Sequence, residues 1–368
     1  MKKYIFFIIS FIFAFMALLF KKISLYLPNE FLSTYFFSFS KLITIGLSQF
    51  FGIFPFSIFE ITIYSLIIIL ISYISLTLFK CIKDFSTALP KIKWMILNLL
   101  SMTFIAYAAF VFLWGLNYSR PPLINELGLV LLEENPEELK ALARLLTERT
   151  NYARENILTD KDDLFTTKQK KREVIQRAAL GFEAIETKYP FLAGHYGPPK
   201  PILASSLMNY TFITGIYSPF TGEPNINIKT PELTLLFTTL HEIAHQRGIA
   251  QENEANFIAF LTSISHPDSD FQYAGYFNAL GYVRAALREI DSECMTEFNS
   301  LLTQGVINDI NYRSDFWSNY QGPLENTFQK MNESYLKANG VSEGNMNYGL
   351  VVDLLLSYYR NELVYYMK

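Results

Sequence analysis

The sequence predicts a mainly helical protein, with three N-terminal transmembrane helices followed by an external helical domain that contains a small sheet. Long uncharged segments are confined to residues 1–118, and patterns typical of amphipathic helices fill residues 119–368. Charge divides the chain at the same point. The first part carries nine lysines, no arginine and three acidic residues, a net charge of +6, whereas the second carries 22 basic and 31 acidic residues, a net charge of −9. An acidic domain without a basic cluster is not expected to bind nucleic acid.

Three uncharged segments are long enough, or nearly so, to cross a bilayer as helices. A helix needs about 20 residues to span the hydrocarbon layer. The segments are residues 4–20, 61–79 and 94–118. Lysines border them, and the third ends in the aromatic-rich "FLWGLNY", which suits the membrane interface. The first segment lacks a clear small-x-small cleavage site, so we expect a retained anchor rather than a signal peptide.

The orientation of these spans is predicted from the lysines. The loop "KCIKDFSTALPKIK", residues 80–93, carries four of them. Because lysine-rich loops remain on the cytoplasmic side, this loop and the N-terminus are expected inside. Residues 23–58 and everything after Tyr118 are then outside, and the lipid bilayer is the first predicted partner.

Residues 42–59 are also nearly all apolar, but they are not expected to form a fourth span. They contain Gly46, Gly52 and Pro55, and no room remains for a turn before the second span begins at Ile61. We expect an interfacial or re-entrant segment that leads into that span.

The external domain begins after "SRPPL". Residues 136–156 open with proline and acids and space their leucines three and four apart, and residues 171–189 repeat this helical pattern. Residues 199–230 are rich in β-branched and aromatic residues with interspersed Gly and Pro, which predicts two or three short strands. Residues 231–248 then predict a helix that opens with proline and closes with glycine. Further helices follow to the C-terminus.

The best-defined helix carries the motif "HEIAH". His241 and His245 are four residues apart, so on a helix both project from one face and can share a zinc ion. Glu242 points toward the open coordination position, where it can take a proton from water and later give it to a leaving amine. The motif therefore predicts a zinc site with hydrolytic chemistry, and the alternative is a helix that carries two histidines by chance.

The third metal ligand is less well determined by the sequence. Gly248 allows the chain to turn after the motif helix. In one large class of zinc peptidases a histidine follows six residues after the second one, but that position is Gln251 here. Glu252 and Glu254 lie just beyond. On a regular helix they point about 200° apart, so they cannot both be ligands.

Glu252 is the favoured ligand, and Glu254 remains the alternative. Glu252 and Asn256 are four residues apart, so both can face the metal, with Asn256 holding a histidine ligand by a hydrogen bond. Either acid could instead be a solvated residue at a helix N-terminus, where the helix dipole favours negative charge.

The two motifs together resemble those of the Glu-zincin peptidases. "HEIAH" followed by "ENEAN" is similar to the pairing of His-Glu-x-x-His with Glu-x-x-x-Asp in that group, and to Glu-x-x-Ala-Asp in its membrane-bound prenyl-protein and heat-shock peptidases. Asn256 stands where an acid is usual, as it does in the related antirepressor-cleaving group. The separation between the two motifs is shorter here than in most of those families. The resemblance implies a zincin-like α+β metallopeptidase domain.

A wider resemblance covers nearly the whole chain. "LWGLNYSRPPL", "GIYSPFTGEPNIN", "HEIAHQRGIAQENEANF" and "YLKANGVSEGNMNYGLVVDLL" are similar to the pattern of the bacterial family named domain of unknown function 3810. This resemblance implies a multi-pass protein of a bacterial inner or plasma membrane, with a zinc-dependent, peptidase-like domain on the extracytoplasmic side. It implies no substrate.

Several other polar residues are candidates for roles in the site. Glu223 and Asn225 lie in a strand-like segment beside which a peptide substrate could dock, although a plain hairpin explains that segment equally well. Tyr335 and Tyr348 are candidates to stabilise an oxyanion. His195 and His266 precede loop motifs and are expected on the surface. Cys81 and Cys294 have no partner at ligand spacing, and Ser205 and Ser206 lack the setting of a hydrolase nucleophile.

The function predicted from the sequence is a membrane-anchored zinc metallopeptidase that acts on a peptide or protein outside the membrane. Two alternatives remain. The zinc-binding domain could be a non-catalytic sensor or scaffold, or it could hydrolyse a non-peptide component of the envelope.

Overall fold

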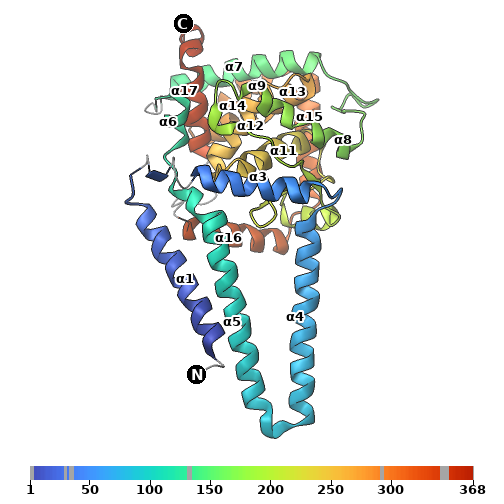
Figure 1. Cartoon of the computed structure of the whole chain (residues 1–368). Helices are drawn as coiled ribbons and strands as arrows, with labels where there is room; N and C mark the ends of the chain where they lie inside the picture. Colours follow the sequence, from blue (N-terminus) through green and yellow to red (C-terminus); the bar gives the residue numbers. More distant parts are fainter. Residues whose placement is uncertain are drawn as a thin grey trace.

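Three long apolar helices extend from one end of a helical domain (Figure 1). The computed structural model describes residues 4–28, 31–32, 37–130, 135–290, 294–339 and 348–367. The long helices are α1 (Ile5–Ser24), α4 (Ile58–Lys83) and α5 (Ala88–Leu113). Each has the length and apolar composition to cross a membrane, in agreement with the three spans that the sequence predicts. The N-terminus and the α4–α5 turn both lie at the end far from the domain (Figure 1), as the predicted orientation requires.

The third helix differs from its predicted range of 94–118. It begins at Ala88, so that Lys91 and Lys93 lie within its first two turns, and it ends at Leu113. Residues Gly115–Ser119 form the tighter 3-10 helix η4, whose residues Leu116 and Asn117 are buried. The aromatic end of this segment therefore belongs to the domain rather than to the span.

Helix α1 packs along α5 through small side chains. Ala17 on α1 and Ala108 on α5 are almost fully buried with Val111 and Leu116 in a cluster separate from the main core. Small residues let two membrane helices approach closely, which increases their dispersion contacts.

Helix α3 (Ser38–Gly52) lies across the base of the domain, crosswise to the three long helices (Figure 1). Its polar side faces the domain, where Gly197 N donates a hydrogen bond of 3.0 Å to Ser48 Oγ and Lys200 Nζ donates one of 2.9 Å to Gly52 O. A Cβ atom at Gly197 would overlap the Ser48 carbonyl, so only glycine permits this approach. The opposite side exposes large apolar residues: Phe39, Leu42, Phe50 and Ile53. This arrangement fits the interfacial alternative of the prediction.

The sheet has three short strands in the order β1-β3-β2. They are β1 (Lys200–Pro201), β2 (Gly215–Ser218) and β3 (Glu223–Ile226). β1 runs parallel to β3, and β2 runs antiparallel to it with Gly215 opposite Ile226 and Ser218 opposite Glu223. The central strand is thus β3, whereas β2 is an edge strand.

Two buried carboxylates join the sheet to the membrane helix α4. Glu223 accepts hydrogen bonds from the first amides of α4, Ile58 N at 3.2 Å and Phe59 N at 2.8 Å. In return, Glu60 of α4 accepts from Leu203 N and Ala204 N, both at 2.8 Å. Each carboxylate thus accepts from two successive backbone amides of the other element.

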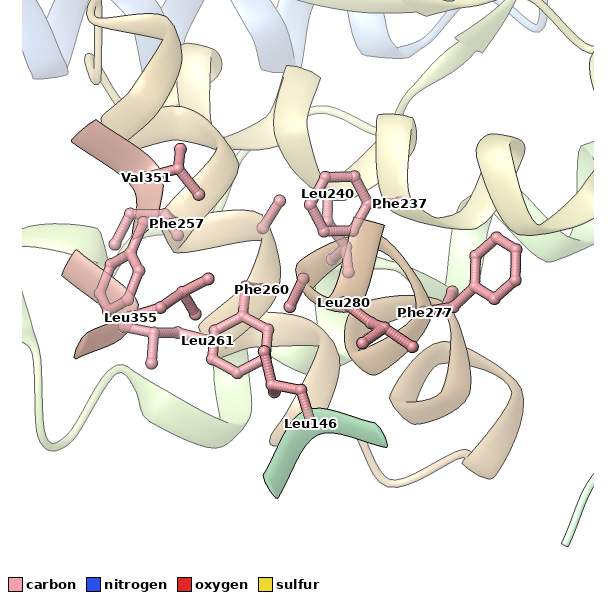
Figure 2. Packing of buried hydrophobic residues seen from close by; sticks show 14 of the residues in the cluster. Leu146, Phe237, Leu240, Phe257, Phe260, Leu261, Phe277, Leu280, Val351 and Leu355 are labelled. Carbon is pink, nitrogen blue, oxygen red and sulfur yellow. The ribbon is translucent and has the colours of Figure 1, made fainter. Parts of the chain in front are cut away.

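Five helices form the core of the domain. They are α7 (Pro136–Glu155), α11 (Glu232–Gln246), α12 (Glu252–Ile264), α13 (Ser269–Ile290) and α17 (Tyr348–Tyr366). Figure 2 shows how Leu146, Phe237, Phe260 and Leu280 meet there with other apolar residues. This packing fixes the relation between α11 and α12, which carry the predicted site.

Shorter elements complete the described domain. The helices are α6 (Leu123–Leu127), α8 (Lys171–Arg177), α9 (Ala179–Ile185), α10 (Ser205–Met208), α14 (Cys294–Ser300), α15 (Gln304–Ser318) and α16 (Pro323–Ala338). The 3-10 turns are η3 (Phe85–Thr87), η5 (Pro190–Leu192) and η6 (Asn209–Thr211).

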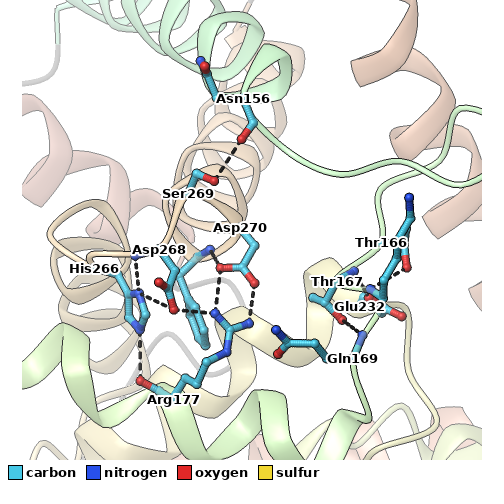
Figure 3. A network of polar contacts seen from close by, with 12 residues as sticks. Asn156, Thr166, Thr167, Gln169, Arg177, Glu232, His266, Asp268, Ser269 and Asp270 are labelled. Atoms are coloured by element: carbon cyan, nitrogen blue, oxygen red, sulfur yellow. Dashed lines mark hydrogen bonds and ion pairs between the residues drawn. The ribbon is translucent and has the colours of Figure 1, made fainter.

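The helix expected over residues 171–189 is interrupted between α8 and α9. Asp268 N donates to His266 Nδ1, so the other ring nitrogen, Nε2, donates to Arg177 O at 3.0 Å and ends α8. Arg177 also forms ion pairs with Asp268 and Asp270, as Figure 3 shows. The network ties α8 to the start of α13, and it makes His266 a buried structural residue rather than the surface residue that we expected.

A buried ion pair between Arg154 and Asp309 offers a test of the domain core. Asp309, only 2% exposed, accepts hydrogen bonds from Arg154 Nε at 2.8 Å, Tyr273 OH at 2.7 Å and Phe165 N at 2.8 Å. Asp309→Asn removes the buried carboxylate that faces Arg154 and leaves this guanidinium only the exposed carboxylate of Asp163, so we expect a loss of about 3 kcal/mol in the free energy of unfolding.

The measurement is chemical or thermal unfolding of the purified full chain. The control is Asp315→Asn, an exposed carboxylate on the same helix, for which a change below about 0.5 kcal/mol is expected. Equal stability of the two variants would show that the Arg154–Asp309 pair does not support the core.

Candidate metal centre

The motif helix α11 presents both histidines to one side. It follows Pro231 and ends at Gln246, close to the predicted range. The rings of His241 and His245 stand edge to face with centroids 4.5 Å apart. The i,i+4 spacing thus places two imidazoles together, as helical geometry requires.

A tight reversal at Gly248 brings the next helix back to the histidines. Gly248 has φ of +86°, a left-handed conformation that favours glycine. Gly248 N donates to His245 O at 2.8 Å, and Ile249 N donates to Ala244 O at 3.2 Å. Arg120 Nη1 donates to Gly248 O at 3.2 Å from outside the turn. Helix α12 then begins at Glu252, only a few residues later.

Glu252 reaches both histidines. Its Oε2 lies 3.2 Å from His241 Nε2, and its Oε1 lies 3.7 Å from His245 Nε2. The possible donor atoms of the three residues lie within 4.8 Å of one another, so the group could hold a metal ion. Two imidazole nitrogens and a carboxylate oxygen are a donor set that transition metals accept.

The outer nitrogen of each ring is held by a hydrogen bond. His241 Nδ1 donates to Asn256 Oδ1 at 2.8 Å, and His245 Nδ1 donates to Ile249 O at 2.7 Å. These acceptors fix a proton on Nδ1 of each ring, so in the neutral ring Nε2 is the nitrogen whose lone pair is available to a metal ion. Asn256 is the residue one turn after Glu252 on α12, in keeping with the spacing that led us to select it.

The three side chains compensate one another electrostatically. Burial alone would raise the pKa of Glu252, but the two histidines outweigh it and lower that pKa. Burial opposes protonation of His245, yet Glu252 and Glu242 raise the pKa of His245 to about 9. A metal cation bound to the two rings would neutralise the Glu252 carboxylate in the same way as the protons of the histidines do.

Glu242 is buried beside the group and lacks a complete set of partners. It is 5% exposed, and its Oε2 has no hydrogen-bond partner among the described residues. Its side chain packs against Gly215 of β2, where a Cβ atom would come within 2.5 Å of Glu242 Cγ. Burial raises the pKa of Glu242, and the nearby histidines only partly offset this. A carboxylate of raised pKa with a free oxygen suits proton transfer.

Glu254 points away from the histidines. Its Oε1 accepts a hydrogen bond of 2.6 Å from Leu123 N. Burial raises its pKa to about 7, although the Leu123 amide and Arg120 act in the opposite direction. Of the two acids that the sequence left open, the structure brings Glu252 to the histidines.

A cavity of about 620 Å³ opens over the group. The edge strand β2 and the preceding Thr214 form one side of it, and helices α11, α13 and α16 supply other walls. Its lining includes His241, Glu242, His245 and Glu252. A cavity of this size can admit a segment of an extended ligand.

Aromatic residues from the end of the third long helix complete the cavity wall. Trp114 stands edge to face against His245 with centroids 5.7 Å apart. Its Nε1 donates to Tyr335 OH at 3.2 Å, and Tyr118 OH lies 3.2 Å from the same hydroxyl. Sequence reasoning missed Trp114 and Tyr118 because it assigned "FLWGLNY" to the membrane interface. Their amphipathic rings were a signal for burial with a polar contact as much as for lipid.

Other predicted residues lie elsewhere. Glu223 and Asn225 are not among the cavity-lining residues in the described chain: both are buried on the central strand, and Ser57 Oγ of the α4 cap donates to Asn225 Oδ1 at 2.6 Å. In this structure both contact α4, and their role in substrate binding stays a prediction. His195 is exposed, and its carbonyl accepts from Gln49. The side chains of Tyr348 and Cys294 lie outside the described part of the chain.

The fold and this site define a protein with three candidate membrane helices, a mainly helical domain and a possible metal-binding group of two histidines and one glutamate. The chain belongs to DUF3810, a protein family of unknown function whose model matches residues 35–356. This match confirms the resemblance seen in the motifs, and it covers both α4 and α5 as well as the metal centre. Comparisons with curated proteins and with solved structures found no match.

The geometry predicts different effects for the two acids. Glu252→Gln removes the charged oxygen that faces both histidines, so we expect the bound metal to fall by about tenfold or more. Glu254→Gln keeps an oxygen that can accept from Leu123 N, so metal content should stay near that of the unaltered chain. Metal analysis of the two purified full-length variants compares them directly, and loss of metal in Glu254→Gln alone would reverse the assignment.

Proposed function

We propose that this protein is a membrane-anchored zinc metallopeptidase that hydrolyses a peptide or protein on the extracytoplasmic side. The observation that carries the proposal is the position of Glu242, which lies buried with a free carboxylate oxygen beside His241, His245 and Glu252. A purely structural metal site needs no such acid.

Zinc is the metal that best suits the donor set. Catalytic zinc sites use three protein ligands of this kind and leave one position open toward a cavity. Here the group faces the 620 Å³ cavity rather than being closed by a fourth side chain among the described residues. A zinc ion held by His241, His245 and Glu252 supplies a Lewis acid toward a carbonyl oxygen and toward water.

Glu242 provides the proton transfer. Its free Oε2 accepts the proton of the attacking water, and the same oxygen then delivers it to the nitrogen of the leaving amine. Burial supports this role because it raises the pKa of the carboxyl and thereby makes it a stronger base when ionised. Gly215 permits the close approach, since a side chain there would displace Glu242.

The edge strand β2 offers a docking place for the peptide. It lies at the border of the sheet, and Gly215, Ile216 and Tyr217 line the cavity. An extended chain can pair with such an edge through backbone hydrogen bonds, which gives affinity with little dependence on sequence. This arrangement favours a peptide over a non-peptide substrate.

Tyr335 supplies a hydroxyl group for the developing oxyanion, and Tyr118 holds that group in place by donating a hydrogen bond to it. Both line the cavity, and their hydroxyls contact each other at 3.2 Å. Trp114 Nε1 donates to Tyr335 OH, which leaves the Tyr335 proton free to point into the cavity. Burial raises the pKa of Tyr335, so the hydroxyl stays protonated and remains a donor.

The location follows from the membrane helices. With the lysine-rich α4–α5 turn and the N-terminus on the cytoplasmic side, the domain and its cavity lie on the outer face of a bacterial inner or plasma membrane. The cavity wall contains Trp114 and Tyr118, which directly follow α5. Substrates are therefore expected close to the bilayer surface.

Glu242→Gln tests catalysis separately from metal binding. The amide keeps the size of the side chain but cannot accept the proton, so hydrolysis should fall by about 100-fold or more while zinc content is unchanged. Turnover is measured with peptide libraries on the purified full chain, and Glu289→Gln, an exposed acid on α13, serves as the matched control.

The same experiment distinguishes the alternatives. A non-catalytic sensor or scaffold would bind zinc, and Glu242→Gln would match the unaltered protein in every assay and in cells. A hydrolase of a non-peptide envelope component would leave peptides intact and cleave envelope fragments, with the same dependence on Glu242.

Tyr335→Phe tests the oxyanion role. Removal of one preorganised donor is expected to lower kcat by about 100-fold with little change in KM, because the interaction forms only in the transition state. Zinc content should be unchanged. Tyr320→Phe, which alters a tyrosine outside the cavity lining, is the control, and an equal effect of both variants would remove Tyr335 from the mechanism.

A further inference from the structure

A second cavity lies on the other side of His245 from the metal centre. Its volume is about 260 Å³, and it is enclosed by α3, the segment around η4 and the C-terminal end of α11. Trp114, Tyr217 and His245 line both cavities. The proposed peptidase chemistry does not use this second space, although two sequence motifs, "LWGLNYSR" and "HQRG", supply much of its lining.

Three cationic side chains line this cavity. They are Lys41 from α3, Arg120 after η4 and Arg247 at the end of α11. Glu126 is the one acid in the described lining. None of the three cations is within ion-pair distance, 4.0 Å, of a described carboxylate. The cavity therefore holds an excess of positive charge.

Arg247 is the most constrained of the three cations. It is 7% exposed, and its guanidinium lies between the rings of Phe182 and Tyr196, 4.4 Å from each centroid. Its Nε and Nη1 have no hydrogen-bond partner among the described residues. The aromatic faces stabilise the charge in part, but the unused N–H groups keep their capacity to donate.

The other two cations are held in place near Arg247. Arg120 lies over the ring of Phe37 and donates to Gly248 O. Lys41 Nζ donates to Phe191 O at a long 3.4 Å. Burial lowers the pKa of Lys41, and the positive charges of Arg247 and Arg120 lower it further. Glu186 acts in the opposite direction but does not cancel these effects on the pKa of Lys41, so the two arginines repel Lys41 across the cavity.

We propose that this cavity is a binding site for a phosphate group. A phosphate carries enough negative charge and acceptor oxygens to satisfy three cations and the free N–H groups of Arg247 at once. The volume suits one such group with a small substituent. The ligand would offset the excess positive charge, and its oxygens would accept hydrogen bonds from the buried N–H groups of Arg247 that have no partner among the described residues.

The phosphate could be free in solution or part of a lipid headgroup. Lys41 lies on α3, whose outer side exposes Phe39, Leu42 and Ile53 and is expected at the membrane interface. A headgroup could therefore reach the cavity beside α3. Both sources share the same recognition chemistry, and the experiment separates them.

The test measures binding to the purified full chain in detergent. The probes are inorganic phosphate, short-chain phosphatidylglycerol and short-chain phosphatidylcholine, and calorimetry or a thermal shift gives the affinity. Lys41→Gln and Arg247→Gln should each weaken binding by about tenfold or more. Arg284→Gln should leave binding unchanged, because Arg284 is a partly buried arginine on α13, outside the cavity.

Each outcome decides the proposal. Binding of inorganic phosphate that depends on Lys41 and Arg247 supports a soluble phosphate ligand, and the same dependence for the lipids alone supports a headgroup. Absence of binding, or binding that both variants retain, overturns the proposal. Binding lost only on metal removal would place the phosphate at the metal centre and also overturn it. If Arg247→Gln does not fold, Lys41→Gln decides, since the one hydrogen bond that Lys41 Nζ makes to the described part of the chain is the long one to Phe191 O.

Discussion

The reversal of the chain at Gly248 is the constraint on which the site depends. Helix α11 carries two histidines, and only a turn this short brings the first residue of α12 back to them. Gly248 adopts φ of +86°, and Arg120 binds its carbonyl from outside. The same turn supplies the Ile249 carbonyl that fixes the ring of His245. One backbone conformation thus determines the ligand set and the orientation of a ligand.

The membrane helices are part of the domain rather than a separate tether. Glu223 caps the first amides of α4, and Glu60 of α4 binds amides of the domain in return. The end of α5 continues into the cavity wall through Trp114 and Tyr118. The cavity therefore lies at the domain end of the candidate membrane helices, and under our proposal the substrate enters close to the bilayer surface.

Buried charge is handled in two different ways on the two sides of His245. At the metal centre, two histidines and Glu252 offset one another, and a metal ion can replace that balance. In the second cavity, Arg247 lies between two aromatic rings, has no carboxylate within ion-pair distance among the described residues, and keeps free donors. The first arrangement suits a cation and the second suits an anion. We therefore propose a zinc ion for the first cavity and a phosphate group for the second.

The sequence by itself determined what depends on local periodicity. The apolar lengths predicted α1, α4 and α5, and the i,i+4 spacing predicted that His241 and His245 share a face. Helical periodicity also excluded joint ligation by Glu252 and Glu254. It could not choose between them, because the choice depends on how α12 is rotated by the core around it.

Tertiary structure alone decided the long-range contacts. It directed Glu254 to Leu123 N, placed Glu223 and Asn225 against α4, and brought Trp114 to the metal centre. These partners are separated by more than a hundred residues, so no local pattern records them. A buried polar group is satisfied by whichever partner the packed helices bring within reach, and only the folded arrangement specifies that partner.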